Sequence, residues 1–329
     1  MSVGRSEPLV GTPVGRRALR IIVETRELTL AVLIAAIVGG MSIASPFFLS
    51  LANFHAIVIG MAPTAIIAVG MTVLLASGGF DLSVGSVLAL ASTIVALLLI
   101  KGASIPTAAA SAMLVGVLVG LANGLVVTKI GVNPLVATLG SMSIARGVAL
   151  VMTEGFSLSN LPPAFGWAGR TEIAGAPFLL WVTLLLVVGF DLAMRNGSFF
   201  RKIYYIGSNE RAARLSGLAV DRVKIIAYVL SGTLAAFAGI LLASRLMSGT
   251  PTAGAGLELQ VLAAAVIGGA SLRGGEGTII GAFLGVIFVA LINNAMTMLA
   301  VSIYWQMIVT GAVLVLAVAL DMLVRRPRG

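Results

Sequence analysis

Ten long apolar stretches joined by short connectors limit what this 329-residue chain can fold into. A helix of about 20 apolar residues is long enough to cross the hydrocarbon core of a bilayer. Hydrophobic residues make up 59% of the chain and charged residues only 10%, against about 25% charged residues in a typical soluble domain. The sequence therefore predicts an all-α polytopic membrane protein with about ten transmembrane helices.

The apolar stretches define a transmembrane domain at 28–324 between short polar tails at 1–27 and 325–329. The first stretch resembles the core of a signal peptide, with a weak small-x-small site at Ser42 and Ala44, but it is long and nine more stretches follow. We therefore interpret it as an uncleaved first span. The expected spans are 28–44, 54–76, 82–100, 105–128, 132–152, 176–194, 225–247, 255–272, 277–300 and 302–320.

The distribution of Lys and Arg predicts which ends of the spans face the cytoplasm. If the N-terminus is placed inside, seventeen of the 21 Lys and Arg residues fall in the cytoplasmic segments. Cytoplasmic loops are enriched in Lys and Arg, so this distribution favours that orientation. The connectors on the other side carry only Lys101, Arg170 and Arg245, and Arg146 lies within a span. We therefore expect both termini, and the long charged loop at 195–224, to be cytoplasmic.

A short helix is expected inside that loop. Asn209 is a favourable N-cap for a helix from Glu210 to Ser216, and Gly217 suits the position after its end. Seven residues make a rod about 10 Å long, which is too short to bury a core of its own. The sequence therefore indicates a helix that presses on a partner protein.

Glycines spaced four residues apart predict close helix packing, since small residues let helix backbones approach each other in a membrane. The shared pattern on the fourth and ninth spans also raises the hypothesis of two inverted five-helix halves. The packing positions are Gly116, Gly120, Gly124, Gly277, Gly281 and Gly285.

Two glycine-rich interruptions, 77–83 and 268–277, place ionisable residues beside apolar helices. Broken helices of this kind expose backbone groups toward a pathway in transporters. The plainer alternatives are that Asp81 or Ser83 only caps the third span, and that the second interruption is an ordinary cytoplasmic turn. The sequence leaves both open.

Polar residues inside the spans are also open to two interpretations, a place on a transport pathway or a structural role. Arg146 either marks a pathway or extends toward the nearby membrane surface. Asn123, Asn293 and Asn294 either bond neighbouring helices together or face a polar path.

Several kinds of chemistry are excluded. The chain has no cysteine and one histidine, His55, so it offers neither a thiolate metal site nor a histidine cluster, and we expect no bound metal. No lysine follows a glycine, so the phosphate-binding loop GxxxxGK[ST] is absent. An intramembrane enzyme has little support, and the energy for any transport must come from elsewhere.

Four motifs in order resemble the ribose/xylose/galactoside family of bacterial ABC importer permeases. They are Gly78–Ser86 (GGFDLSVGS), Asn133–Gly140 (NPLVATLG) leading to Arg146-Gly147, Gly207–Gly217 (GSNERAARLSG) and Gly268–Gly275 (GGASLRGG). The resemblance spans nearly all of the chain beyond the N-terminal tail. One departure is Phe80, where members often carry isoleucine.

The resemblance implies a permease subunit of an ATP-driven importer in the bacterial inner membrane, carrying a ribose-like pentose, a related monosaccharide or another small polar solute. The implied partners are a cytoplasmic ABC ATPase, which binds the ATP and Mg²⁺, a periplasmic or lipoprotein sugar-binding protein, and a second permease copy or close paralogue. This chain itself would bind no cofactor. The alternatives are an ion-coupled secondary carrier of small polar solutes and, less favoured, a membrane scaffold.

The resemblance also implies site residues. The helix that couples to the ATPase would comprise Ser208, Asn209, Glu210, Arg211, Ala212, Ala213, Arg214, Ser216 and Gly217. Residues expected to line or gate the pathway are Phe80, Asp81, Ser83, Asn133, Arg146 and Asn293.

Overall fold

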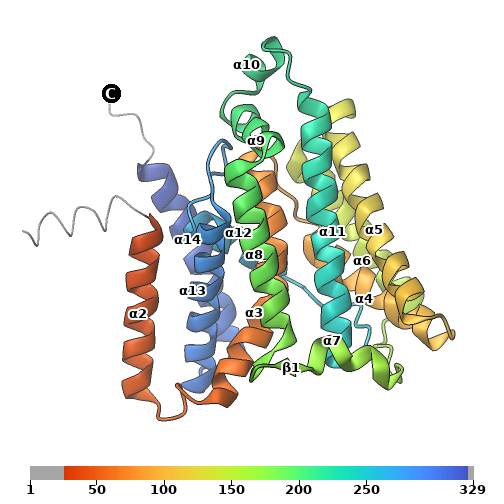
Figure 1. The fold of residues 1–329 in the computed structure, drawn as a ribbon, viewed down its shortest axis with the longest axis vertical. Coiled ribbons are helices and arrows are strands. Elements are labelled where there is room, and N and C mark those ends of the chain that lie inside the picture. Colours follow the sequence, from red (N-terminus) through yellow and green to blue (C-terminus); the bar gives the residue numbers. More distant parts are fainter. Residues whose placement is uncertain (1–25, 325–329) are drawn as a thin grey trace, which may run out of the picture.

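The computed structural model describes residues 26–324, which form a bundle of helices with one small hairpin of two strands, each two residues long (Figure 1). Residues 1–25 of the expected tail at 1–27, and all of the expected tail at 325–329, lie outside the described residues. The long helices are α2 (Arg26–Ala44), α3 (Leu51–Ala76), α5 (Ile105–Leu125), α6 (Pro134–Thr153), α8 (Phe178–Asn196), α11 (Val220–Leu246), α13 (Ile279–Met298) and α14 (Ile303–Val324).

Shorter elements complete the described chain. They are α4 (Val84–Ile100), the π-helical turn η1 (Val126–Ile130), the 3₁₀ turn η2 (Pro163–Gly166), α7 (Trp167–Arg170), β1 (Glu172–Ile173), β2 (Ala176–Pro177), α9 (Ser198–Ser208), α10 (Glu210–Leu215) and α12 (Leu257–Ile267). The strands β1 and β2 pair antiparallel.

The all-α membrane fold expected from the sequence is confirmed. Within the described residues, seven helices are long and apolar enough to cross a membrane, and α4, α12 and the first part of α14 are shorter apolar helices. Together they correspond to the ten expected spans. The protein is a multi-pass membrane protein.

The core forms around α3 and α11. From Met61 to Ala76 every residue of α3 is buried, as expected of a helix that is apolar on all sides. α11 packs against α3, α4 and α5, and its Tyr228 is the largest fully buried side chain. Peripheral helices instead expose large apolar side chains, such as Val151 of α6 and Leu185 of α8, which suits contact with lipid.

The glycines of α5 lie against α11. A Cβ atom at Gly116, Gly120 or Gly124 would collide with the α11 backbone at Gly232, Tyr228 or Ile225, so these helices approach too closely for larger side chains. Gly281 and Gly285 of α13 lie in the same way against α12. Gly277 precedes α13, with φ +141, and so does not belong to that helical face.

The eighth span differs from the prediction. A continuous helix over 255–272 was expected, but α12 has 11 residues, or about 17 Å, against a hydrocarbon core of about 30 Å. The residues before it, 247–256, form turns, and Gly249 and Gly254 pack on the side of α4. Pro251 and three glycines in this segment disfavour helix there.

The third span, α4, is likewise short and follows the irregular turn 77–83. The third and eighth spans are five apart, and each follows a non-helical segment. The two inverted halves stay a prediction.

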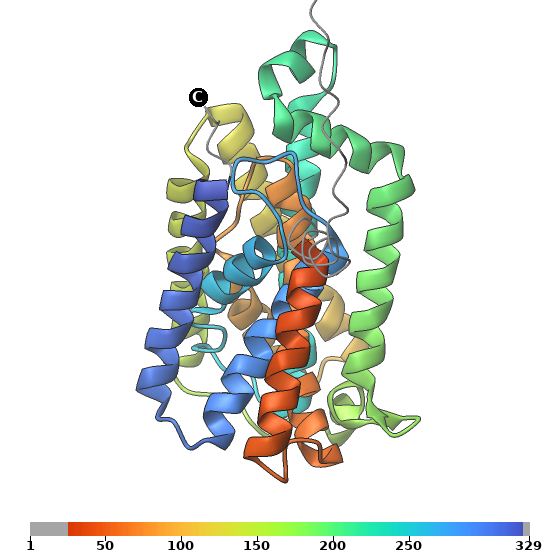
Figure 2. The same ribbon diagram turned by 90° about the vertical axis from the view of Figure 1, so that its left-hand side faces the viewer.

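Loops gather at two ends of the bundle (Figure 1). The α10 end carries α9, α10 and the first turns of α11, and the opposite end carries α7 and the hairpin β1–β2. Figure 2 shows α2, α13 and α14 along one face, with α12 behind them.

Candidate functional site

The first candidate site is α10, which stands at the outermost point of its end of the bundle (Figure 1). Asn209 caps the helix, because its Oδ1 accepts from the Ala212 amide at 2.9 Å. The helix ends at Leu215, one residue earlier than expected, and Gly217 has the left-handed φ of +79. Local sequence therefore determines both ends of α10.

An ion-pair network fastens α10 to the helices beneath it. Glu210 accepts from Arg214 at 2.9 Å and from Lys224 of α11 at 2.5 Å. Arg214 also pairs with Asp221 at 2.7 Å, and Asp221 pairs with Lys129 of η1 at 2.8 Å. The network joins α10 to the start of α11 and the end of the α5–η1 helix, so a displacement of α10 acts on both.

The electrostatic effect of the network appears in the pKa of Glu210. Burial alone would raise this pKa, but hydrogen bonds from Lys224 and Arg214 outweigh it and lower the pKa below its ordinary value. Glu210 is therefore a carboxylate at neutral pH and serves the internal network.

The remaining surface of α10 is free to meet another protein. Leu215 is 85% exposed, although a large apolar side chain is normally buried. Arg211, Ala212, Ser216 and Gly217 are also exposed, while Ala213 is buried against the bundle. Ser208 is exposed and donates to the Tyr204 carbonyl within α9.

The two glycine-rich interruptions meet just below α10. A Cβ at Gly207 of α9 would collide with the Ala76 carbonyl and the Gly275 amide, and a Cβ at Gly274 would lie only 2.8 Å from the Gly78 Cα. The Gly275 amide donates to the Ala76 carbonyl at 3.0 Å. We call these residues, Ala76, Gly78, Gly207, Gly274 and Gly275, the glycine junction. It joins α9, and hence α10, to the end of α3 and to the 268–278 loop.

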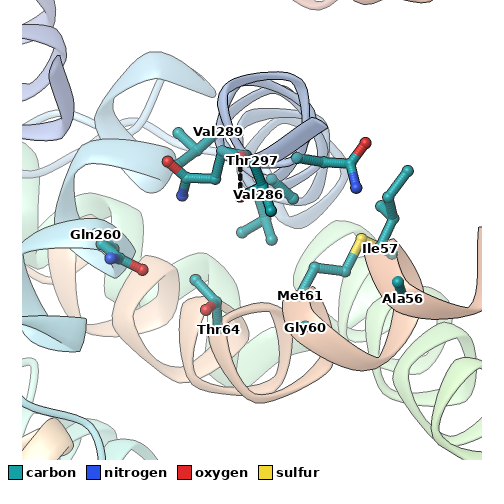
Figure 3. Close-up of a pocket in the computed structure, with 12 residues that line it drawn as sticks. Ala56, Ile57, Gly60, Met61, Thr64, Gln260, Val286, Val289 and Thr297 are labelled. Atoms are coloured by element: carbon teal, nitrogen blue, oxygen red, sulfur yellow. Dashed lines mark hydrogen bonds between the residues drawn. The ribbon is translucent and has the colours of Figure 1, made fainter. Parts of the chain in front are cut away.

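The second candidate site is a polar cavity of about 300 Å³ between α3, α12 and α13 (Figure 3). Thr64, Gln260, Asn293 and Thr297 contribute hydroxyl and amide groups to a wall that also contains Met61 and other apolar side chains. Asn294, also in the lining, exchanges hydrogen bonds with Asn53 of α3 at 2.7 and 3.2 Å.

A second cavity, of about 470 Å³, continues from the first. It lies between α12, α13 and α14, shares Gln260 and Asn293 with the first cavity, and adds Gln306 and Thr310 of α14. We call the two together the polar groove. The described residues that line it include no charged side chain.

The pathway residues expected from the sequence lie in several places. Asn293 lines the polar groove. Asn133 instead caps α6, where its Oδ1 accepts from the Leu135 amide at 2.9 Å. Arg146 donates to the carbonyls of Pro251 and Ala253, both at 2.7 Å, and does not line the groove.

Asp81 is fully buried in a network between helices. Its Oδ1 accepts from the Ser83 amide at 2.8 Å and the Ser83 hydroxyl at 2.5 Å, and from Asn123 of α5 at 3.5 Å. Ser141 of α6 bonds Asn123 in turn. Ser83 makes no side-chain cap of its own, and the carbonyl of Phe80 accepts from Tyr228. The network ties the start of α4 to α5, α6 and α11.

Five residues of the groove lining were not predicted from the sequence: Thr64, Gln260, Thr297, Gln306 and Thr310. The residues expected from the sequence were mainly ionisable residues and asparagines, whereas these five are threonines and glutamines. The available signal was the presence of amide side chains, such as Gln260, inside otherwise apolar helices. Among the described residues, no group of three His, Cys, Asp or Glu side chains could hold a metal ion.

Comparisons with known proteins agree on one family. Residues 53–318 match the model described as branched-chain amino acid transport system / permease component. The ribose import permease protein RbsC of Escherichia coli (strain K12) is 38% identical over 304 residues, which cover 91% of this chain and 94% of that protein. RbsC of Bacillus subtilis (strain 168) is 40% identical over 283 residues, covering 85% and 88%.

The L-arabinose transport system permease protein AraH of Escherichia coli (strain K12) is 38% identical over 276 residues, which cover 84% of each chain. No solved structure matches the chain.

Proposed function

The chain belongs to this family of transport-system permease components, and from that premise we propose that it is the membrane subunit of an ATP-driven importer of a pentose or related monosaccharide. Relatives that cover most of its length are named for ribose import and L-arabinose transport. The observation that carries the proposal is the polar groove, because its chemistry suits a neutral, hydroxyl-rich solute.

The lining of the groove favours a sugar over an amino acid. Amide and hydroxyl side chains both donate and accept hydrogen bonds, as sugar hydroxyls do. A zwitterionic amino acid would instead need charged partners, because burying an unpaired charge is costly. The described lining of the groove contains no charged side chain. The cavity volumes, about 300 and 470 Å³, fall within the usual range for small-molecule sites.

The start of α14 lines the groove and also carries an exposed apolar face, and this face supports a paired arrangement. Tyr304, Trp305 and Met307, near the start of α14, are 61–76% exposed. A second permease copy or close paralogue packed against this face would close the groove into a pathway between two subunits. A substrate-binding protein would deliver the sugar from the β1–β2 end.

We infer that α10 docks on the ATPase subunit, which would bind ATP and Mg²⁺, while this chain itself binds neither. The α10 end and both termini would then face the cytoplasm, in agreement with the Lys and Arg distribution. Closure of the ATPase pair would displace α10. The ion-pair network and the glycine junction would pass that displacement to α11, to α3 and to the 268–278 loop.

Substrate competition in proteoliposomes tests the proposal. The chain is reconstituted with its ATPase and binding protein, and uptake of labelled ribose is measured against unlabelled ribose, arabinose and leucine. We expect the pentoses, and not leucine, to compete. Competition by leucine alone would contradict the substrate class.

Groove variants extend the same assay. Each of Gln260→Ala and Asn293→Ala should raise the KM by about 2- to 12-fold, the effect of losing one hydrogen bond worth about 0.5–1.5 kcal/mol. Ser111→Ala, on the exposed face of α5, is the matched control and should leave the KM unchanged. If all three variants have the KM of the unaltered chain, the groove is not part of the substrate pathway.

A further inference from the structure

The segment 247–256, between α11 and α12, runs along α4 without forming a helix. It starts where Gly249 pairs with Leu158 in an isolated bridge and packs against Ser92 and Thr93. It ends where Gly254 packs against Gly85 and Leu88. Seven residues of helix separate Gly85 from Ser92, so the segment advances about 10 Å along α4.

Irregular backbone inside a membrane protein needs partners for its carbonyl groups. Arg146, which reaches across from α6, supplies them: its Nη1 donates to the carbonyls of Pro251 and Ala253, both at 2.7 Å. Because the guanidinium is always charged, both are charge-assisted hydrogen bonds. Arg146 therefore holds two points of the segment at once.

The contact with α4 leaves the segment no room to move in that direction. A Cβ at Gly85 would collide with the Gly254 carbonyl and the Glu258 carboxylate. Gly256, with φ +78, then begins α12 in a conformation that glycine adopts most readily. One side of the segment is thus fixed between α4 and Arg146.

The residues that follow form a wall of the polar groove. Ala255, Gly256, Leu259 and Gln260 all line its larger cavity. Ala255 is two residues beyond Ala253, a reach of only about 7 Å. A displacement of the held carbonyls therefore cannot be absorbed before it reaches the groove wall.

We propose that Arg146 is a positioning residue for the substrate path, and that its two hydrogen bonds to Pro251 and Ala253 set the position of the groove wall formed by Ala255–Gln260. This inference rests on the proposed function in treating the groove as the path. Arg146 itself does not line the groove and acts through the segment.

The absence of cysteine from the natural chain allows a direct test. Ala255→Cys introduces a single thiol into the groove wall, and its rate of labelling by a water-soluble methanethiosulfonate is measured in nanodiscs. We compare this rate with Arg146 intact, with Arg146→Gln and with Arg146→Lys. Arg170→Gln, at an exposed arginine of the β1–β2 end, is the matched control.

Arg146→Gln should change the labelling rate by at least about threefold and raise the KM for pentose uptake by about tenfold, the scale of one charge-assisted hydrogen bond. The maximal rate should fall by less than about threefold, because the ATPase contacts are far away. Arg146→Lys keeps the charge without the fork of donors and should lie between the two. Arg170→Gln should change neither quantity.

Unchanged labelling and KM in Arg146→Gln would overturn the proposal. A fall in maximal rate alone, equal in Arg146→Gln and Arg146→Lys, would do the same, because it indicates general damage. If Arg146→Gln fails to insert, Arg146→Lys decides the matter by the same two measurements. If the unaltered chain carries no pentose, the proposed function fails, and the labelling comparison still decides whether Arg146 holds the wall.

Discussion

Replacing Glu210 by glutamine removes the charge at the centre of the ion-pair network. Glu210 accepts from Arg214 and from Lys224, and the substitution keeps its size while weakening both interactions. The side chains of Glu210 and Arg214 are 42% and 49% exposed, so this i,i+4 pair contributes only about 0.3–0.5 kcal/mol. Lys224 is only 13% exposed, and losing its charged partner costs about 1–1.5 kcal/mol.

Together these effects destabilise the docked α10 by about 1–2 kcal/mol, a factor of about 5–30 in the population of its open form. Hydrogen exchange measures this population directly. We expect the amides of Ala213, Ser216 and Leu218, which close the turns of α10, to exchange about 5–30 times faster in Glu210→Gln, in nanodiscs without the ATPase. The middle of α11 should be unaffected.

The pH dependence provides a second readout. The lowered pKa of Glu210 means that its stabilisation is complete above the ordinary value of 4.5 and is lost as the pH falls through the lowered pKa. Protection factors of α10, corrected for intrinsic exchange, should therefore be constant from about pH 8 to about pH 5 and decrease below that range. In Glu210→Gln the decrease should be smaller and begin at a lower pH, because Asp221, whose pKa is lowered below its ordinary value of 3.8 by Lys129 and Arg214, still pairs with Arg214.

Glu154→Gln, at an exposed acid of the opposite end, is the control and should change nothing in α10. The reasoning is refuted if Glu210→Gln leaves the protection of Ala213, Ser216 and Leu218 as it is in the unaltered chain.

Three further predictions follow from the contacts described. Gly207→Ala should reduce ATP-driven uptake by about tenfold or more while leaving ATPase binding intact, because its Cβ would collide with Ala76 and Gly275; unchanged uptake would remove the glycine junction from the coupling route. Arg211→Ala and Leu215→Ala should each weaken co-purification of the ATPase, with Lys202→Ala as an exposed control; equal recovery of the ATPase in all three would place docking elsewhere. Asp81→Ala should lower the free energy of unfolding by about 1–3 kcal/mol, because it leaves the buried Ser83 amide without its acceptor, while Asn123 keeps the Ser83 hydroxyl at 3.1 Å; a change in KM with full stability would instead indicate a direct role in the pathway.

The sequence predicted the parts of the fold that local pattern controls. Apolar length located the spans, and the pair of Asn209 and Gly217 located α10 to within one residue. The expected eighth span, 255–272, was too long because apolar composition continues through these residues, while Gly256 precedes the first helical residue and Gly268 and Gly269 end the helix after Ile267. Hydropathy averages over such an interruption.

The candidate site was harder to predict, for a physical reason. Arg146 finds its acceptors about 105 residues away in the chain, and Gln260 matters only because α3, α13 and α14 close around it. The glycine junction likewise joins Gly78, Gly207 and Gly274, which sequence spacing does not relate. Such contacts depend on how helices pack, and a single sequence carries no direct record of that.

Uptake in proteoliposomes under controlled energy sources tests the central claim most directly. The chain, its ATPase and its binding protein are reconstituted together, and labelled ribose is supplied with ATP enclosed, without ATP, and with ionophores that collapse all ion gradients. An ATP-driven permease predicts uptake that requires ATP and persists when the gradients are collapsed. Uptake that proceeds without ATP and stops with the ionophores would contradict the account and identify an ion-coupled carrier.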